Sequence, residues 1–257
     1  MALWNGNEAC LWLSQQHMYL LKTETDCIGR IYSRQFCVYT CPKNWQSRWD
    51  SLQECLRDVV SVYGLQAYTL YLILSGPSLI WKNLNLATKE KEEARSLIIW
   101  DEAIGDGSTT YAFDLARAEK LDESGVYAWM SAAYPYDIVS HIVTELNQMR
   151  CRLRRIDVLP ALVSRLCGGA KTGILYICEP SLVHAIRLKS GIPLSYECIS
   201  SLPQAGQEWL EGEDGSKTAV WFDEENGTWS YPPVSDSMIK TMKQWDTAYP
   251  EAILLAY

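Results

Sequence analysis

Two segments of this chain predict the same order of secondary structure elements, and this repeat is the feature that most constrains the fold. In the first segment, alternating apolar and polar residues predict three strands between residues 9 and 40. An amphipathic helix is expected at 44–64, with Asn44 as its N-cap. The apolar face of this helix is expected to contain Trp45, Trp49, Leu52, Leu56 and Val60. The short apolar run at 68–74 then predicts a buried strand.

The same order returns in the last third of the chain. Three strands, a short helix and a strand are predicted at residues 173–178, 182–189, 194–200, 204–210 and 218–224. The first copy is expected to continue with a helix at 137–149, a strand at 152–160 and a short helix at 161–167, and the second copy to end in a helix at 236–246. The repeat therefore predicts an α/β protein with mixed sheets, built from two copies of one plan, the second of them reduced.

A segment with a different pattern interrupts the first copy. It predicts a strand, a helix with Thr88 as N-cap, and two further strands, at residues 79–86, 88–104, 108–119 and 125–134. We interpret it as an inserted strand-helix-strand-strand subdomain. The expected domains are thus a first lobe at 1–77 and 135–170, the inserted subdomain at 78–134, and a reduced second lobe at 171–257.

Charge and cysteine content exclude several classes of function. The formal net charge of -8 argues against a nucleic-acid-binding surface, which needs clustered Lys and Arg to offset phosphate charge. Nine cysteines in 257 residues, an odd number without a signal peptide, favour free thiols in a reducing compartment. Cys37 and Cys41 lack the second pair of ligands that a structural zinc site needs, so we expect no metal.

One uncharged stretch, between Asp58 and Lys82, is long enough to span a bilayer. Gly64, Gln66 and the Ser75-Gly76-Pro77 turn interrupt it. We therefore interpret it as a helix end followed by two buried strands, and expect no direct insertion into a membrane.

Four stretches in sequence order resemble a known family. They are "LYLILSGPSLIWKNLNL" at 70–86, "TKEKEEARSLIIWDEAI" at 88–104, "RCRLRRIDVLPALVSRL" at 150–166 and "GILYICEPSLVHAIRLKSGIPLSYE" at 173–197. Together with the repeat and the insertion, they resemble the PilM branch of the actin and Hsp70-like ATPase superfamily, the actin-like proteins of type IV pilus assembly. The resemblance covers roughly residues 9 to 200.

The resemblance implies a fold of two ribonuclease H-like lobes and a cytoplasmic protein held at the inner membrane by a partner. Members of this family bind the short N-terminal tail of a bitopic pilus-assembly protein and help to connect an assembly motor ATPase. The architecture is also similar to the cytoplasmic domains of type II secretion L-type proteins. The sequence does not distinguish a pilus from a secretion or competence system.

The resemblance also implies where a nucleotide would bind. Actin-like ATPases hold phosphates with glycine-rich hairpin turns, whose backbone N–H groups point at the phosphate oxygens. Here the first turn would contain Gln15 and Gln16, or in another register Gly6 with Asn5, and neither register offers an acidic metal ligand before a glycine turn. The first phosphate turn is therefore expected to be degenerate.

The other two turns that the family uses also depart from its pattern. In the second, Glu179 places a negative charge where phosphates would lie, and Pro180 lacks an N–H donor. In the third, Asp223 and Glu224 stand where the family has glycines. Like charges about 4 Å apart repel by about 1–4 kcal/mol near a protein surface. We therefore expect no bound cofactor and no catalytic residues.

Three functional hypotheses remain open from the sequence. The first is a non-catalytic scaffold that binds a membrane protein's tail, and Trp4, Trp229 and Trp245 in polar surroundings are candidate partner anchors. The second is an ATP-binding actin-like ATPase of the same machinery. The third is an unrelated mixed α/β binding protein, which a structure without the repeated plan would favour.

Overall fold

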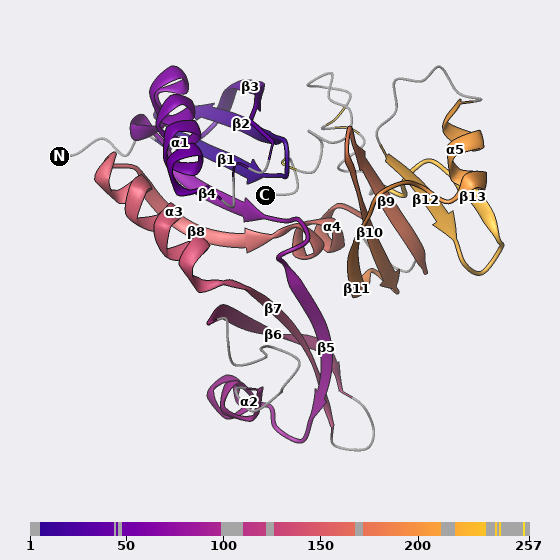
Figure 1. Cartoon of the computed structure of the whole chain (residues 1–257). Helices are drawn as coiled ribbons and strands as arrows, with labels where there is room; N and C mark the ends of the chain where they lie inside the picture. The colour runs from indigo at the N-terminus through magenta and orange to yellow at the C-terminus, as the bar shows by residue number, and fades with distance from the viewer. Residues whose placement is uncertain are drawn as a thin grey trace.

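The computed structural model describes residues 6–43, 45, 48–98, 110–121, 126–167, 172–211, 219–234, 240, 242 and 254. Three sheets organise this part of the chain (Figure 1). Two of them have five strands each, and a sheet of three strands lies below the first of these in the view.

The first lobe is built on a sheet with the order β3-β2-β1-β4-β8. Its strands are β1 (Glu8–Leu13), β2 (His17–Thr25), β3 (Ile31–Thr40), β4 (Thr69–Leu74) and β8 (Arg152–Val158). The first three are antiparallel neighbours, whereas β4 is parallel to β1 and β8 is parallel to β4. Its helical segments are α1 (Trp49–Tyr63), η2 (Leu65–Ala67), α3 (Tyr136–Gln148) and α4 (Leu159–Cys167). The predicted strands and helices of this lobe are confirmed, with small differences at their ends.

Helix α1 starts later than its sequence pattern predicts. The residue at its N-terminal boundary is Arg48 rather than Asn44, which lies outside the described residues. Trp45 is fully buried as expected, but Trp49 is 42% exposed and stacks on the His141 ring at 3.8 Å. The predicted start was wrong because the apolar spacing of Trp45 and Trp49 was interpreted as one helical face, whereas Trp45 precedes the helix. Gly64, at φ 64°, ends the helix in the left-handed conformation that favours glycine.

The inserted subdomain is a three-stranded antiparallel sheet with one helix (Figure 1). It contains β5 (Ile80–Leu86), α2 (Lys91–Ile98), β6 (Tyr111–Leu121) and β7 (Tyr127–Pro135), with the strand order β5-β7-β6. Ala94, Ile98, Leu115 and Trp129 form its own small core. Helix α2 starts at Lys91, and the Glu90 carbonyl oxygen accepts its first hydrogen bond, from the Ala94 N–H at 2.9 Å, so Glu90 and not Thr88 is the N-cap residue. Thr88 lies two residues before this position, where its Oγ1 accepts from the Glu90 N–H at 3.1 Å.

The second lobe has the strand order β11-β10-β9-β12-β13. Its elements are β9 (Gly173–Glu179), β10 (Leu182–Lys189), β11 (Ile192–Ile199), α5 (Gln204–Glu211), β12 (Ala219–Asp223) and β13 (Thr228–Ser230). The order of the first five agrees with the repeated plan. The hairpin from β12 to β13 turns at Asn226-Gly227, and the strand β13 was not predicted from the sequence.

The direction of β12 departs from the repeated plan, because β12 is antiparallel to β9 whereas β4 is parallel to β1. Helix length explains the difference. Helix α1 has 15 residues and spans about 22 Å, enough to return the chain along a whole strand. Helix α5 has 8 residues and spans about 12 Å. The chain therefore enters the second sheet from the end at which it left β11.

One apolar core joins the two large lobes. It contains fully buried residues of the first sheet, such as Leu11 and Leu72, together with Leu175, Ile177 and Ile186 of the second. Since burying apolar surface is the main favourable term in folding, the shared core positions the two lobes against each other.

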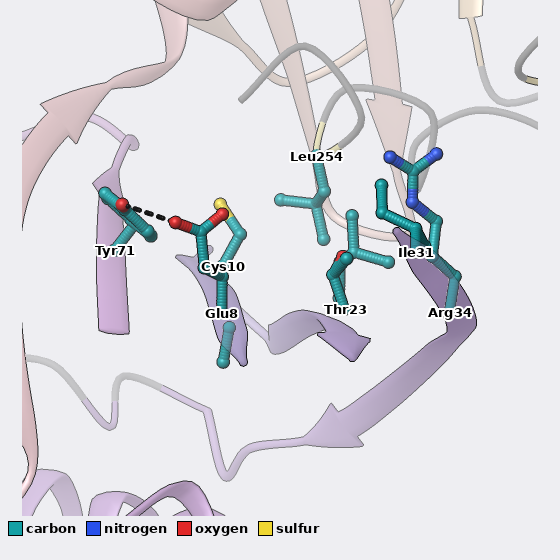
Figure 2. A pocket seen from close by; sticks show the side chains of 9 residues that line it. Glu8, Cys10, Thr23, Ile31, Arg34, Tyr71 and Leu254 are labelled. Atoms are coloured by element: carbon teal, nitrogen blue, oxygen red, sulfur yellow. Dashed lines mark hydrogen bonds between the residues drawn. The ribbon is translucent and has the colours of Figure 1, made fainter. Parts of the chain in front are cut away.

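A pocket of about 170 Å³ lies on the first sheet beneath Leu254 (Figure 2). The side chains around it come from β1 to β4, and Tyr71 donates a hydrogen bond to Glu8 Oε1 at 2.9 Å. Leu254 is 1% exposed, so this residue packs on the first sheet.

Two residues of α1 give a matched test of the core. Leu56 is fully buried and Val62 is 68% exposed on the same helix. We expect Leu56→Ala to lower the free energy of unfolding by about 2–5 kcal/mol, because it removes apolar contacts and leaves a cavity. Val62→Ala should change it by less than about 0.5 kcal/mol. Urea unfolding followed by circular dichroism measures both, and equal effects would show that α1 does not pack as described.

Candidate functional site

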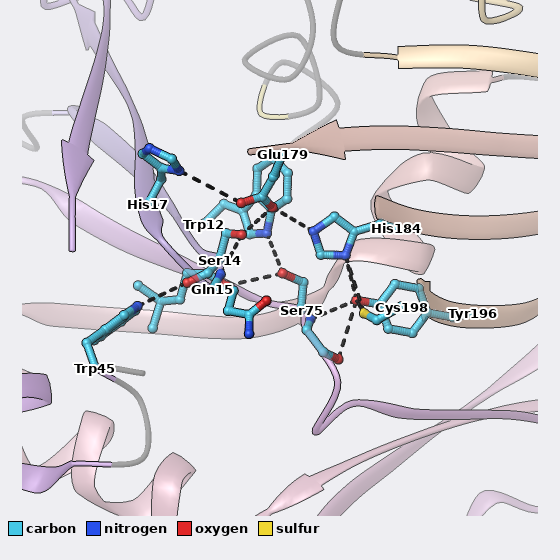
Figure 3. Close-up of polar contacts among 12 residues, drawn as sticks. Trp12, Ser14, Gln15, His17, Trp45, Ser75, Glu179, His184, Tyr196 and Cys198 are labelled. Carbon is cyan, nitrogen blue, oxygen red and sulfur yellow. Dashed lines mark hydrogen bonds and ion pairs between the residues drawn. The ribbon is translucent and has the colours of Figure 1, made fainter. Parts of the chain in front are cut away.

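The two turns that the resemblance assigns to phosphates face each other across the lobes (Figure 3). The first follows β1 and is closed by the Ser14 N–H, which donates to the His17 carbonyl oxygen at 2.9 Å. The second joins β9 to β10, where Glu179 and Leu182 pair across Pro180 and Ser181. The Ser14 hydroxyl donates directly to Glu179 Oε1, so a side chain of the second lobe reaches the turn of the first.

His184 on β10 binds the same carboxylate oxygen. Its Nε2 lies 2.6 Å from Glu179 Oε1, and its Nδ1 lies 2.8 Å from the Tyr196 hydroxyl. The side chains of Glu179 and His184 are 1% and 0% exposed. Buried polar groups of this kind are stable when they are paired and hydrogen-bonded, and Glu179 Oε1 is bonded to both Ser14 and His184.

The environment of His184 favours its protonated form. Burial lowers the pKa of this imidazole, but hydrogen bonds with Cys198 and Glu179 and the charge of Glu179 outweigh burial and raise its pKa to about 9. At neutral pH both ring nitrogens then carry protons, so Nε2 donates to Glu179 and Nδ1 donates to Tyr196. The pair Glu179–His184 is therefore a buried carboxylate and imidazolium.

Tyr196 on β11 extends this cluster back to the first lobe. The Gly76 N–H donates to the Tyr196 hydroxyl oxygen at 2.7 Å, just after the end of β4. Next to it, Trp12 Nε1 donates to Ser75 Oγ at 2.8 Å. The Tyr134 hydroxyl donates to the Ser75 carbonyl oxygen at 3.2 Å. The hydrogen-bonded cluster therefore connects β1, the end of β4 and β7 with β9, β10 and β11.

Further contacts hold the Ser14 turn in place. Trp45 Nε1 donates to the Ser14 carbonyl oxygen at 3.2 Å, and the Gln15 N–H donates to Ser14 Oγ at 2.6 Å. The second carboxylate oxygen, Glu179 Oε2, lies 3.9 Å from His17 Nδ1. Within the described part of the chain, neither of these two atoms has a hydrogen-bond partner. The turn thus presents Ser14 and His17 to the carboxylate of Glu179.

The structure brings four of the six predicted phosphate-turn residues to this cluster and separates the other two from it. Gln15 and Gln16 form the turn after β1, and Glu179 and Pro180 lie in the turn that faces it. Asp223 and Glu224 are elsewhere, because Asp223 pairs with Gly173 at the opposite end of β9. Their predicted position at the phosphate turns is therefore wrong, because β12 is antiparallel to β9 and its last residue lies at the start of β9.

The predicted partner anchors are also revised. Trp229 is half-buried and packs near Tyr176 and Phe222, with ring centroids at 5.6 Å and 4.9 Å. A side chain on Gly206 would collide with the Trp229 ring, so α5 covers this residue closely. Trp229 is thus part of the small core of the second lobe and not an exposed anchor. Trp4 and Trp245 lie outside the described residues.

His184, Tyr196 and Ser14 were not predicted as members of a site. A signal for His184 was present, because it is in register with Leu182, Ile186 and Leu188 on the buried face of β10. A histidine in a buried register needs a polar partner. The partner was not identifiable from the sequence, since Ser14 and Glu179 are 165 residues apart.

A second candidate site is an apolar groove of about 200 Å³ between the first lobe and the inserted subdomain. Its lining comes from β4, β6, β7, α3 and β8, and includes Ala112, Phe113, Val139, Ile156 and Val158. Strands β6 and β8 are both edge strands of their sheets. An edge strand has unpaired backbone groups that can bind an extended peptide, so the groove combines apolar lining with two such edges.

Comparison of whole structures identifies similar proteins, whereas comparison of the sequence with family models and curated proteins does not. No protein-family model and no curated protein matches the sequence. A chain of the PilM–PilN type IV pilus biogenesis complex superposes with a TM-score of 0.55 and 12% identity. The match covers 82% of this chain and 66% of that one, just under two thirds of its length.

The protein has an actin-like fold. The third hypothesis from the sequence, an unrelated α/β architecture, is therefore excluded. The cytoplasmic domain of EpsL, an inner membrane component of the Vibrio cholerae type II secretion system, matches with 10% identity and a TM-score of 0.46, over 82% of this chain and 76% of that one. A Bacteroides thetaiotaomicron protein with actin-like ATPase fold and unknown function matches with 12% identity and a TM-score of 0.47, over 80% and 75%.

None of the described helices of this actin-like protein is both long and apolar enough to cross a membrane. The uncharged stretch after Asp58 forms the end of α1, then η2, β4 and the start of β5, so the predicted helix end and two strands are confirmed. Strand β4 is mostly buried as predicted, but β5 is half-buried to exposed.

The raised pKa of His184 predicts a specific pH dependence of stability. Because the folded pKa, about 9, is above the ordinary value of 6.5, the stabilisation is complete below pH 6.5 and is lost as pH rises through 9. We expect the wild type to lose about 3 kcal/mol of this contribution between pH 6 and pH 9.5. The measurement is urea unfolding at both pH values in the wild type and in His184→Gln.

The variant should unfold more easily than the wild type at pH 6, and the difference should shrink at pH 9.5. His141→Gln, which removes an exposed imidazole on α3, is the matched control and should follow the wild type. A difference between wild type and His184→Gln that does not change with pH would contradict the charged pair.

Proposed function

We propose that this protein is a non-catalytic actin-like scaffold of a type IV pilus or type II secretion-like assembly, in which the protein's own side chains close the interlobe cleft in place of a nucleotide. The observation that carries the proposal is the carboxylate of Glu179, held between the lobes by the Ser14 hydroxyl and His184 Nε2. It lies between the two turns that bind phosphates in the family that the sequence resembles. The carboxylate thus takes the role of the bound anion.

The charges at the two turns support the proposal that ATP does not bind between the lobes. A phosphate entering between the turns would meet the buried charge of Glu179, and like charges at about 4 Å repel by about 1–4 kcal/mol even at surface-like dielectric. The positive charge of His184 is already paired with Glu179. Pro180 offers no N–H, and the Gln15 N–H is bonded to Ser14 Oγ.

The apolar groove between the first lobe and the inserted subdomain is the surface that we assign to the partner. Its half-buried lining and the edge strands β6 and β8 suit an extended, partly apolar segment. We propose that this segment is the cytoplasmic tail of a bitopic inner-membrane assembly protein. Binding it would hold the protein in the cytoplasm at the inner membrane, where it could also contact an assembly motor ATPase.

The alternative function is an ATP-binding actin-like ATPase of the same machinery, and a melting experiment separates the two. We expect ATP with Mg²⁺ at millimolar concentration to leave the melting temperature unchanged. Specific binding at a hundredfold excess over Kd would add about 2.7 kcal/mol of stability and raise the melting temperature. ADP with Mg²⁺ should behave in the same way, and a rise with either nucleotide would favour the ATPase.

A pair of substitutions on β6 tests the groove. Ala112 lines the groove, whereas Ala116 is an exposed residue four positions along the same strand and does not line it. We expect Ala112→Arg to weaken binding of the partner tail at least tenfold, because it places a charge and bulk in the apolar groove. Ala116→Arg should leave affinity unchanged.

The assay is fluorescence anisotropy with labelled N-terminal tails of bitopic inner-membrane assembly proteins from the same genome. Melting curves of both variants confirm that they are folded. Tight binding of a tail that neither substitution affects would move the partner site away from the groove.

A further inference from the structure

We propose that Cys198 is a reactive thiol that forms a mixed disulfide with small disulfides, in a side pocket next to the interlobe cluster. The assignment concerns a modification site and does not depend on whether the protein works in a pilus or a secretion system. It rests on the neighbours of the thiol, on a pocket that it lines, and on the contrast with other cysteines of the chain.

The thiol lies next to an oriented imidazole (Figure 3). Cys198 Sγ is 3.7 Å from His184 Nδ1 and donates to the Tyr196 hydroxyl at 3.2 Å. On its other side, His184 is held by Glu179 at 2.6 Å. A nucleophile beside a histidine that a carboxylate orients is the arrangement that activates cysteines.

A pocket gives small molecules access to this thiol. Its volume is about 280 Å³, close to the lower end of the about 300–1,000 Å³ typical of small-molecule sites. It is lined by Gly76, Pro77, Leu79, Tyr196, Glu197 and Cys198. Cys198 itself is half-buried and is part of the lining of this pocket. The pocket is therefore the route by which a small disulfide can reach the sulfur.

Other cysteines of the chain serve as internal comparisons. Cys178 and Cys37 are also half-buried, but burial raises the pKa of Cys178 to about 11 and raises that of Cys37 as well. A thiol with a raised pKa is a poor nucleophile at neutral pH. Cys27 is exposed in the turn between β2 and β3, so its rate of modification is the reference for an accessible thiol.

The chemical step is a thiol–disulfide exchange. The Cys198 proton passes to solvent, and the thiolate, next to the His184 imidazolium, attacks one sulfur of the small disulfide. A new S–S bond forms as the old one breaks, and the leaving thiolate takes up a proton. The small disulfide is the oxidant, and it is reduced to one free thiol for each cysteine modified.

Oxidised glutathione and peptide mass spectrometry test the assignment on the full chain at pH 7.5. We expect Cys198 to be glutathionylated at least tenfold faster than Cys178 and Cys37. In His184→Gln the rate at Cys198 should fall at least tenfold, while the rate at Cys27 stays the same. Equal rates at Cys198 and Cys178, or an unchanged rate at Cys198 in the variant, would overturn the proposal.

Because His184→Gln removes a buried partner of Glu179, a second pair of variants keeps the test independent of its folding. The probe is 5,5′-dithiobis(2-nitrobenzoate), an aromatic disulfide whose released thiolate is coloured. In a Cys27→Ser background, which removes the exposed thiol, the protein should show a fast phase of one thiol, which a further Cys198→Ser removes and a further Cys178→Ser retains. A fast phase that persists in Cys198→Ser and is lost in another cysteine variant would assign the reactive thiol elsewhere.

Discussion

The carboxylate of Glu179, buried between two lobes and bonded to Ser14 and His184, is the interaction on which this account depends. A buried anion must be neutralised or fully hydrogen-bonded, and removing one partner of such a pair typically costs 3–5 kcal/mol. Here the partners come from both lobes, and Tyr196 extends the cluster to Gly76. In the proposed function, these contacts of the chain's own side chains close the cleft without a ligand.

This arrangement gives a physical picture of how an actin-like fold can work without a nucleotide. The shared apolar core and the polar cluster together fix the relation of the lobes. In the proposed function, the interlobe contact of Glu179 replaces the conformational control that a bound nucleotide exerts in an ATPase. The inserted subdomain forms a groove against the first lobe. In the proposed function, this groove is the partner site and has one fixed geometry.

The sequence predicted much of the fold, because alternating strands and amphipathic helices carry local signals, as "HMYLLKT" and "LVHAIRLK" show. It did not predict the direction of β12, which depends on the short reach of α5, nor the late start of α1. Glu179 was identifiable from the sequence because it stands at a turn where the family has glycines. Its contacts with Ser14 and His184 were not, because they depend on how two distant turns meet in space.

A crystal structure of the protein grown with a non-hydrolysable ATP analogue and Mg²⁺ tests the central claim most directly. The account predicts that Ser14, Glu179 and His184 remain bonded to one another and that no nucleotide lies between the turns. Clear density for the triphosphate in that position, with the Glu179 side chain displaced from His184, would contradict it.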